Sequence, residues 1–301
     1  MSEAEVNFAP ARTASPLGDA VLECVWTGLF AILFTGLVSG IWSGLLLANL
    51  KLTPAIPWAI APMALSLWLG WSLLGGPGGL PGVRAKRAAY LRAGALPAPT
   101  MLWAVAAGAS GIAALSGLWI VLHALIKTPT NPLAQVSQYP PLTVVLALAM
   151  ASISGGVSEE AGFRGYFQGA LEKHGLGWVA VAVTALVMAP IHAETQGFVW
   201  PNIVFYLLVD GMLGALAYLT KSIRPGIVVH ALGLFVFFTL IWRQDASRPM
   251  FAAGGDHAWF WIHVAQTIVF AGLSAAAFAR LARGFKKGGG ATGEAPAQAD
   301  S

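Results

Sequence analysis

Long apolar runs alternate with short polar segments along most of the chain. A helix needs about 20 apolar residues to cross the hydrocarbon layer of a membrane, where only helices and closed barrels satisfy their own backbone hydrogen bonds. The pattern therefore predicts an all-α fold, a polytopic membrane helix bundle of about eight transmembrane helices. The predicted spans are residues 21–49, 55–76, 101–126, 141–158, 176–193, 198–219, 225–242 and 257–281.

The composition supports this class of protein. Hydrophobic residues make up 57% of the 301 residues and charged residues only 10%, whereas soluble domains usually carry about 25% charged residues. The single cysteine, Cys24, excludes an intramolecular disulfide framework and a cysteine-rich zinc site. The net charge of +4 does not indicate nucleic-acid binding, because the basic residues lie in short segments between apolar runs.

The distribution of lysine and arginine predicts the orientation. With the N-terminus inside, the other side of the membrane receives only Lys51, Lys127, Arg243 and Arg248. The inner side receives the remaining thirteen, namely Arg12, Arg84, Lys86, Arg87, Arg92, Arg164, Lys173, Lys221, Arg224, Arg280, Arg283, Lys286 and Lys287. The positive-inside rule then places both termini in the cytoplasm. Because the composition is rich in alanine and glycine, we expect a bacterial inner (plasma) membrane.

A single membrane domain is predicted between two polar ends. Residues 1–20 form a cytoplasmic N-terminal segment without the basic-then-apolar order of a cleavable signal peptide. Residues 21–283 form the transmembrane domain. Residues 284–301 are expected to be a disordered cytoplasmic tail, because their sequence is largely glycine, alanine and proline.

The densest group of charges in the membrane region is the segment Ser158-Glu159-Glu160-Ala161-Gly162-Phe163-Arg164. An ionisable side chain inside a membrane helix costs about 2.5–3.5 kcal/mol on insertion scales, so it requires a reason. On a helix, Glu160 and Arg164 are i,i+4 neighbours that can pair, while Glu159 points about 100° away. Glu159 would then be free to act as a general base. A helix end in cytoplasmic water explains the same charges equally well.

Three further polar residues lie within or beside apolar spans. His192 follows Pro190 near the end of the fifth span, and His230 lies inside the seventh. Asp210 in the sixth span could support a histidine or hydrogen-bond between helices. A lone buried histidine is more often structural than catalytic, but two histidines with a carboxylate pair favour a site. His123 and Glu194 are interpreted as structural or interfacial residues.

The order Glu-Glu-x-x-x-Arg, then His192, then His230 resembles the CAAX protease and bacteriocin-processing family of intramembrane endopeptidases, also called Abi. The resemblance covers about residues 141–242 and includes the approach to the last histidine, from Gly211 to Pro225. It implies a metal-independent endopeptidase without a cofactor. Its substrate would be a membrane-associated peptide or protein.

The resemblance also implies a role for each residue. Glu159 would activate a water for attack on a peptide carbonyl, and His192 would help to hold that water. Arg164 would pair with Glu160, and His230 would donate a hydrogen bond to the oxyanion.

Two positions depart from the family pattern. Met188 stands where the family usually has phenylalanine. Leu234 stands where the family usually has asparagine, so a polar donor is absent one turn after His230. A non-catalytic scaffold or partner-binding relative is therefore one alternative, and a proton-coupled transporter is another. One glutamate and two histidines could also ligate zinc, and activity that survives a strong chelator would support the metal-free mechanism.

The predicted spans disagree with the positions that the site residues need for catalysis. If the fourth span ends inside at residue 158 and the fifth runs outward from residue 176, Glu159 and His192 lie near opposite membrane faces. Catalysis requires them to be close. Either the fourth helix continues through residue 170, as its small residues Gly162, Gly165 and Gly169 favour, or one helix is short or re-entrant.

Overall fold

The computed structural model describes residues 16–75, 81–125, 138–241 and 257–289, and the regular structure in these residues is helical. Elements η2 and η3 are π-helical turns that continue α5 and α9. The elements are α1 (Pro16–Leu52), α2 (Ile60–Gly75), α3 (Pro81–Leu91), α4 (Ala98–Leu125), α5 (Pro141–Glu159), η2 (Glu160–Phe167), α6 (Gln168–Lys173), α7 (Trp178–Gln196), α8 (Trp200–Thr220), α9 (Arg224–Val236), η3 (Phe237–Ile241) and α10 (His257–Gly289).

The predicted membrane bundle is confirmed. Six helices in the described residues are long and apolar enough to cross a membrane. Two shorter apolar helices, Ile60–Gly75 and Trp178–Glu194, correspond to the second and fifth predicted spans. The chain is therefore an integral membrane protein.

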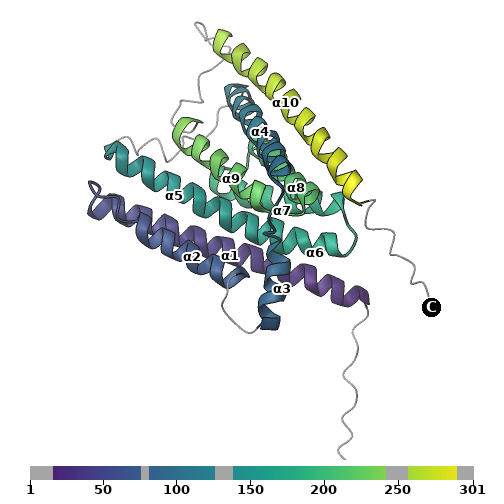
Figure 1. Cartoon of the computed structure of the whole chain (residues 1–301). Helices are drawn as coiled ribbons and strands as arrows, with labels where there is room; N and C mark the ends of the chain where they lie inside the picture. The colour runs from purple at the N-terminus through teal and green to yellow at the C-terminus, as the bar shows by residue number, and fades with distance from the viewer. Residues whose placement is uncertain (1–15, 76–80, 126–137, 242–256, 290–301) are drawn as a thin grey trace, which may run out of the picture.

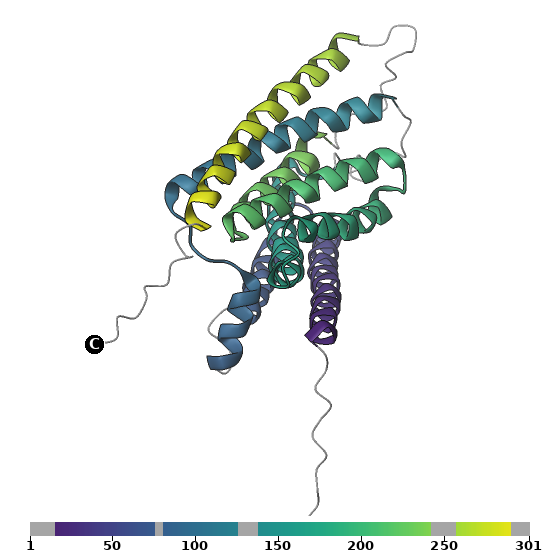
Figure 2. The ribbon, with the colours of Figure 1, turned by 90° about the vertical axis from the view of Figure 1, so that its right-hand side faces the viewer.

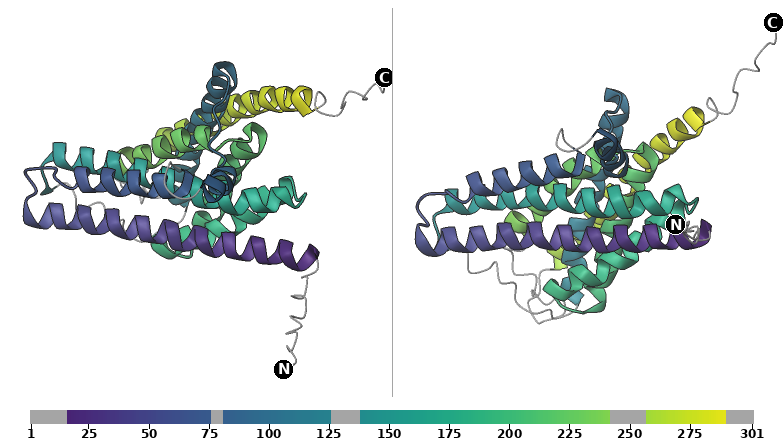
Figure 3. Two further views of the ribbon diagram at one scale, coloured as in Figure 1. Left: turned by 60° about the horizontal axis from the view of Figure 1, so that its bottom comes forward. Right: turned by 90° about the horizontal axis from the view of Figure 1, so that it is seen from below.

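The helices form two groups joined through α9. Helices α1, α2 and α5 pack along one another in the lower part of Figure 1, and Figure 3 shows the same three side by side. Helices α4 and α10 pack together on the other side, and Figure 2 shows them crossing α1 and α5 at a steep angle. Helix α9 contacts both α5 and α4, while α8 contacts α7 and α4. Because α8 also contacts α9 and the turn η2 that continues α5, these segments meet near the middle.

Glycine permits the closest helix contacts in this middle region. A Cβ atom on Gly156 of α5 would lie 2.9 Å from the backbone nitrogen of Ala231 on α9. A Cβ atom on Gly162 of η2 would lie 3.2 Å from the Cα atom of Ala31 on α1. Small residues allow such approaches between membrane helices, and these two hold the motif helix tightly between α1 and α9.

The predicted end of the fourth span at residue 158 is wrong. The apolar helix continues from Pro141 to Lys173, through both glutamates of the motif. It can do so because Glu160 and Arg164 are paired inside the protein, which removes the need for water at this point. The chain then turns through Gly175 and Gly177, whose φ angles of +84° and +49° suit glycine, and returns as α7.

Helix α3 was not predicted, because the hydrophobic pattern detects apolar helices and this one is basic. Its residue Arg87 donates a hydrogen bond to the Leu73 carbonyl, and Tyr90 donates one to the Glu23 carboxylate. At the other end of the chain, α10 continues to Gly289, so the first residues of the predicted tail are helical. The rest of that tail and residues 1–15 lie outside the described residues.

Candidate active site

The two adjacent carboxylates lie where the α-helix changes to a π-helical turn. Glu159 ends α5 and Glu160 begins η2. Such π-turns are rare and occur frequently at functional sites. The Glu160 side chain is completely buried, whereas 12% of the Glu159 side chain is exposed. The two neighbouring acids therefore face different environments.

Glu160, Arg164 and Asp210 form a buried ion network. Arg164 Nη1 lies 3.3 Å from Glu160 Oε1, so the predicted i,i+4 pair is present. Arg164 Nη2 lies 2.6 Å from Asp210 Oδ1 on α8, and all three side chains are fully buried. One buried cation thus lies between two acids from different helices. These ion pairs offset much of the desolvation free energy of burying each charge.

Glu159 lies between the two histidines of the sequence motif. Its Oε2 atom is 3.7 Å from His192 Nε2 and 3.5 Å from His230 Nε2. These distances are longer than direct hydrogen bonds, and this buried oxygen accepts no hydrogen bond from the described residues. Two helices, α7 and α9, therefore bring imidazole nitrogens to a single carboxylate oxygen on α5.

The continuous motif helix explains how Glu159 and His192 reach the same depth. Glu159 lies 14 residues before the end of α6 at Lys173, and His192 lies 14 residues after the start of α7 at Trp178. At about 1.5 Å per residue, each lies about 21 Å from the turn between the two helices. The first of the two solutions expected from the sequence, a longer fourth helix, is the one observed.

The second nitrogen of His230 is held by the other acid of the motif. Its Nδ1 atom lies 3.0 Å from Glu160 Oε1, and the ring is buried. Because Glu160 is also paired with Arg164, the carboxylate links the histidine to the buried ion network. The orientation of the His230 ring is thereby fixed.

Asp210 contributes to the same site. Its Oδ2 atom lies 3.9 Å from His192 Nε2, while its Oδ1 atom binds Arg164. Both uses proposed for Asp210 from the sequence, support of a histidine and a bond between helices, fit this position. The sequence did not show that Asp210 is a second partner of Arg164.

Sequence reasoning missed one aromatic neighbour of the site. The ring of Tyr206 stacks on His192 with centroids 4.5 Å apart and an interplanar angle of 20°. Tyr206 lies four residues before Asp210 on α8, so the two share one helix face. This four-residue spacing is the feature of the sequence from which Tyr206 could have been predicted to lie near the site.

Met188 and Leu234, the two residues that depart from the family pattern, both lie close to site residues. Met188 is buried, and its sulfur lies 3.5 Å from Arg164 Nη1. Leu234 is partly buried against Leu148 and Phe238. Its Cδ1 atom would lie 3.0 Å from a Cβ atom on Gly155, a position that is itself 3.9 Å from Glu159 Oε1. An apolar side chain therefore lies near the Glu159 carboxylate, one helical turn after His230.

The remaining polar residues lie outside this group. His123 is buried between the Trp119 carbonyl, 2.9 Å away, and the Asn202 side-chain oxygen, 3.2 Å away. Glu194 is exposed near the end of α7. Within the described residues, no group of three or more histidine, cysteine, aspartate or glutamate side chains is arranged to hold a metal ion.

Residues 141–236 match the family model described as Rce1-like, the type II CAAX prenyl endopeptidases. This match confirms the resemblance to the CAAX protease and bacteriocin-processing family. It spans α5 to α9 and contains every residue of the site, from Glu159 to His230. No curated protein and no solved structure matches the chain.

Proposed function

We propose that the protein is an intramembrane endopeptidase that uses Glu159 to activate a water molecule and needs no metal ion. The observation that carries this proposal is the position of Glu159 Oε2 between His192 Nε2, at 3.7 Å, and His230 Nε2, at 3.5 Å. The substrate is a peptide bond in a membrane-associated protein or peptide. The family match supports this reaction class.

In the proposed reaction, the Glu159 carboxylate takes a proton from the water as its oxygen attacks the peptide carbonyl carbon. His192 helps to orient this water. The tetrahedral intermediate then collapses as the carbon–nitrogen bond breaks, and Glu159 returns the proton to the leaving amine. The products are a carboxylic acid and an amine, and the glutamate is restored.

The geometry of His230 supports a role for this residue in stabilising the oxyanion. His230 Nδ1 lies 3.0 Å from Glu160 Oε1. If Nδ1 donates to this carboxylate, a second donor at Nε2 requires the doubly protonated ring. The positive charge of that ring lies between the carboxylates of Glu159 and Glu160. A charged donor in a buried site stabilises developing negative charge strongly.

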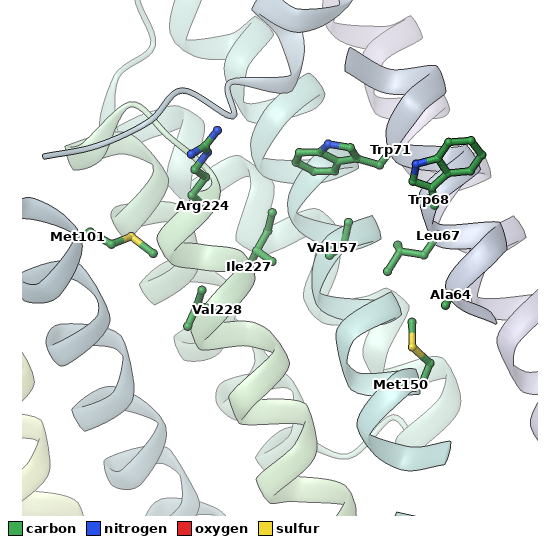
Figure 4. Close-up of a pocket in the computed structure, with 10 residues that line it drawn as sticks. All are labelled: Ala64, Leu67, Trp68, Trp71, Met101, Met150, Val157, Arg224, Ile227 and Val228. Carbon is green, nitrogen blue, oxygen red and sulfur yellow. The ribbon is translucent and has the colours of Figure 1, made fainter. Parts of the chain in front are cut away.

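An apolar pocket of about 540 Å³ adjoins the helices that carry Glu159 and His230 (Figure 4). Val157 of α5 and Ile227 and Val228 of α9 form one wall, and Trp68 and Trp71 of α2 form the other. Its lining is almost entirely apolar. We assign this pocket to an apolar segment of the substrate, which would reach the site from within the bilayer.

Replacement of the proposed base tests the mechanism. We expect Glu159→Gln to reduce cleavage of a membrane-anchored reporter peptide in proteoliposomes by about 10²–10⁴-fold, the usual contribution of a general base. The amide has nearly the same size but cannot accept the proton. The measurement is the initial rate of product formation by mass spectrometry.

Glu194→Gln is the matched control, because Glu194 is an exposed glutamate on α7 outside the site. It should cleave at the rate of the unchanged protein. Both variants should show the same thermal unfolding midpoint. Cleavage by Glu159→Gln at the control rate would reject Glu159 as the base.

The apolar side chain at position 234 favours a second candidate function. The Leu234 side chain lies one turn after His230, near the Glu159 carboxylate, where the family pattern has a polar donor. We propose as the alternative a non-catalytic relative that binds a membrane partner. In that case Glu159→Gln has no effect on the cell, whereas substitutions on the exposed helix surface do.

A further inference from the structure

A second pocket, with a volume of about 670 Å³, lies between α3, α6 and the residue that follows α8. Unlike the pocket in Figure 4, it is strongly basic. Four cationic side chains, Lys86, Arg92, Lys173 and Lys221, line it, together with the single carboxylate of Glu172. This pocket lies outside the proposed active site and takes no part in the proposed reaction.

Within the part of the chain that the structure describes, the carboxylates near this basic pocket are fewer than its cations. Glu172 is shared between Arg92, at 3.0 Å, and Lys221, at 2.9 Å. Glu23 receives Lys173 at 2.8 Å. Lys86 has no ion pair within the described residues. The basic pocket therefore retains excess positive charge, and Lys86 is its least compensated cation.

The basic pocket lies at the boundary of the membrane domain. Lys173 is the last residue of the apolar helix that begins at Pro141, and Lys221 directly follows the apolar helix that ends at Thr220. The side predicted to be cytoplasmic carries these same residues. Cations at helix ends lie at the level of lipid phosphate groups, where each contributes to the attraction of anionic lipid.

We propose that the basic pocket binds the phosphate of an anionic phospholipid headgroup. The volume accommodates a phosphate with a small polar substituent, and the Lys86 and Lys221 ammonium groups lie on flexible stems that can adjust to it. A lipid is favoured over a soluble phosphate compound because the cations lie where apolar helices end, next to a surface that supplies headgroups continuously.

Arg92 connects the basic pocket to the motif helix. Its guanidinium group donates to the Arg164 carbonyl in η2 and to the Ala217 carbonyl in α8, each at 3.2 Å. It also holds Glu172 on α6. A headgroup bound at this point would contact the junction of three elements, so we expect it to stabilise the folded protein.

The test measures lipid binding, which does not depend on cleavage. The purified full-length protein is titrated with phosphatidylglycerol or phosphatidylcholine in detergent, and retained lipid is measured by native mass spectrometry. Phosphatidylglycerol should be retained at least tenfold more strongly. Lys86→Gln should weaken its retention about fivefold, the factor for one cation near an anionic surface, and Lys86→Glu should weaken it further.

Arg84→Gln is the matched control, because Arg84 is an exposed cation on the same helix that does not line the basic pocket. It should retain phosphatidylglycerol within twofold of the unchanged protein. All three variants should unfold at the same temperature in phosphatidylcholine, which shows that the fold is intact.

Three results would overturn the proposal. Equal weakening by Arg84→Gln and Lys86→Gln would indicate general surface attraction without a defined site. Equal retention of phosphatidylcholine would exclude selection of an anion. Thermal stabilisation by millimolar inorganic phosphate that equals the effect of phosphatidylglycerol would assign the basic pocket to a soluble phosphate compound. Loss of cleavage in Glu159→Gln has no bearing on any of these outcomes.

Discussion

At the scale of single residues, Glu159 and Glu160 are neighbours in the chain, but their side chains lie in different environments. Glu160 is buried between Arg164 and His230, so its charge is used within the protein. Glu159 is partly exposed and lies near two imidazole nitrogens. The π-helical turn that starts between them changes the direction in which following side chains point.

Asp210 is predicted to stabilise the fold as well as the site. Asp210→Ala should lower the free energy of unfolding by about 3–5 kcal/mol, because it leaves part of the buried Arg164 charge without its 2.6 Å partner. Chemical unfolding in detergent measures this change. Asp19→Ala, which removes an exposed aspartate in α1, should change the value by no more than about 1 kcal/mol. Equal effects would show that the buried pair is dispensable.

Leu234 is predicted to limit the rate. Leu234→Asn should raise kcat at least about tenfold with little change in KM, because it adds an amide donor one turn after His230, where an oxyanion donor contributes about 10²–10³-fold. Leu232→Asn is the control, since Leu232 is an exposed position on the same helix. A kcat that does not rise in Leu234→Asn would refute the limiting role.

Part of this site could be predicted from the sequence. The Glu160–Arg164 pair follows from i,i+4 spacing alone, and both histidines were selected because they lie in apolar spans. The second bond of Arg164 to Asp210 and the stacking of Tyr206 on His192 depend on how α8 packs against η2 and α7. Such contacts between distant segments are not encoded in a local pattern.

At the scale of elements, the close contact between α5 and α9 controls the distance from Glu159 to His230. This contact depends on Gly156, since a Cβ atom there would lie 2.9 Å from the Ala231 backbone nitrogen. The atom that would be displaced is backbone, so it cannot move without the helix. The spacing of the two helices is therefore set at Gly156, three residues before the proposed base.

Gly156→Ala is predicted to separate these helices. We expect a loss of about 1–3 kcal/mol of stability from overpacking, together with a large loss of cleavage as His230 moves away from Glu159. Gly40→Ala in α1 is the control, because nothing lies within 4 Å of a Cβ atom at that position. Thermal unfolding and cleavage rates measure both effects. A stable and active Gly156→Ala variant would show that α9 can shift without affecting the site.

The boundaries of the helices depend on contacts between distant residues, which the hydrophobic pattern does not contain. It located the eight apolar helices of the described residues, but it ended the fourth at residue 158 because two acids follow. Whether a helix can continue through charges depends on their partners. Glu160 pairs with Arg164 on the same helix, but the other partner of Arg164, Asp210, lies 46 residues later in another helix. Helix α3 was missed for the opposite reason, because it is basic and held by contacts with α1 and α2.

At the scale of the whole molecule, two kinds of cavity lie around the motif helix. The apolar pocket of Figure 4 is formed by α2, α4, α5 and α9 and includes exposed side chains such as Trp68 and Val228. The basic pocket lies at the end of the helices. A substrate from the bilayer and a lipid headgroup would thus approach different parts of the protein.

Filling the apolar pocket is predicted to weaken substrate binding. Val228→Trp should raise KM about tenfold, which corresponds to the loss of roughly 55 Å² of apolar contact at about 25 cal/mol per Å². The kcat value should change little, since the site residues are untouched. Leu232→Trp places the same ring on an exposed part of α9 outside this pocket and should leave KM unchanged. Equal KM values for the two variants would exclude the pocket as the substrate's path.

The turn between α6 and α7 lies at a similar distance along the helices from Glu159 and from His192. Glu159 and His192 each lie about 21 Å along their helices from that turn. An extended peptide advances about 3.3 Å per residue, so under the proposed function a substrate would need roughly six extended residues to reach from Glu159 to the level of this turn. A helical flank covers less than half that distance with the same number of residues. Under the proposed function, we expect the length of this hairpin to select substrates by how far, and in what conformation, they extend beyond the scissile bond.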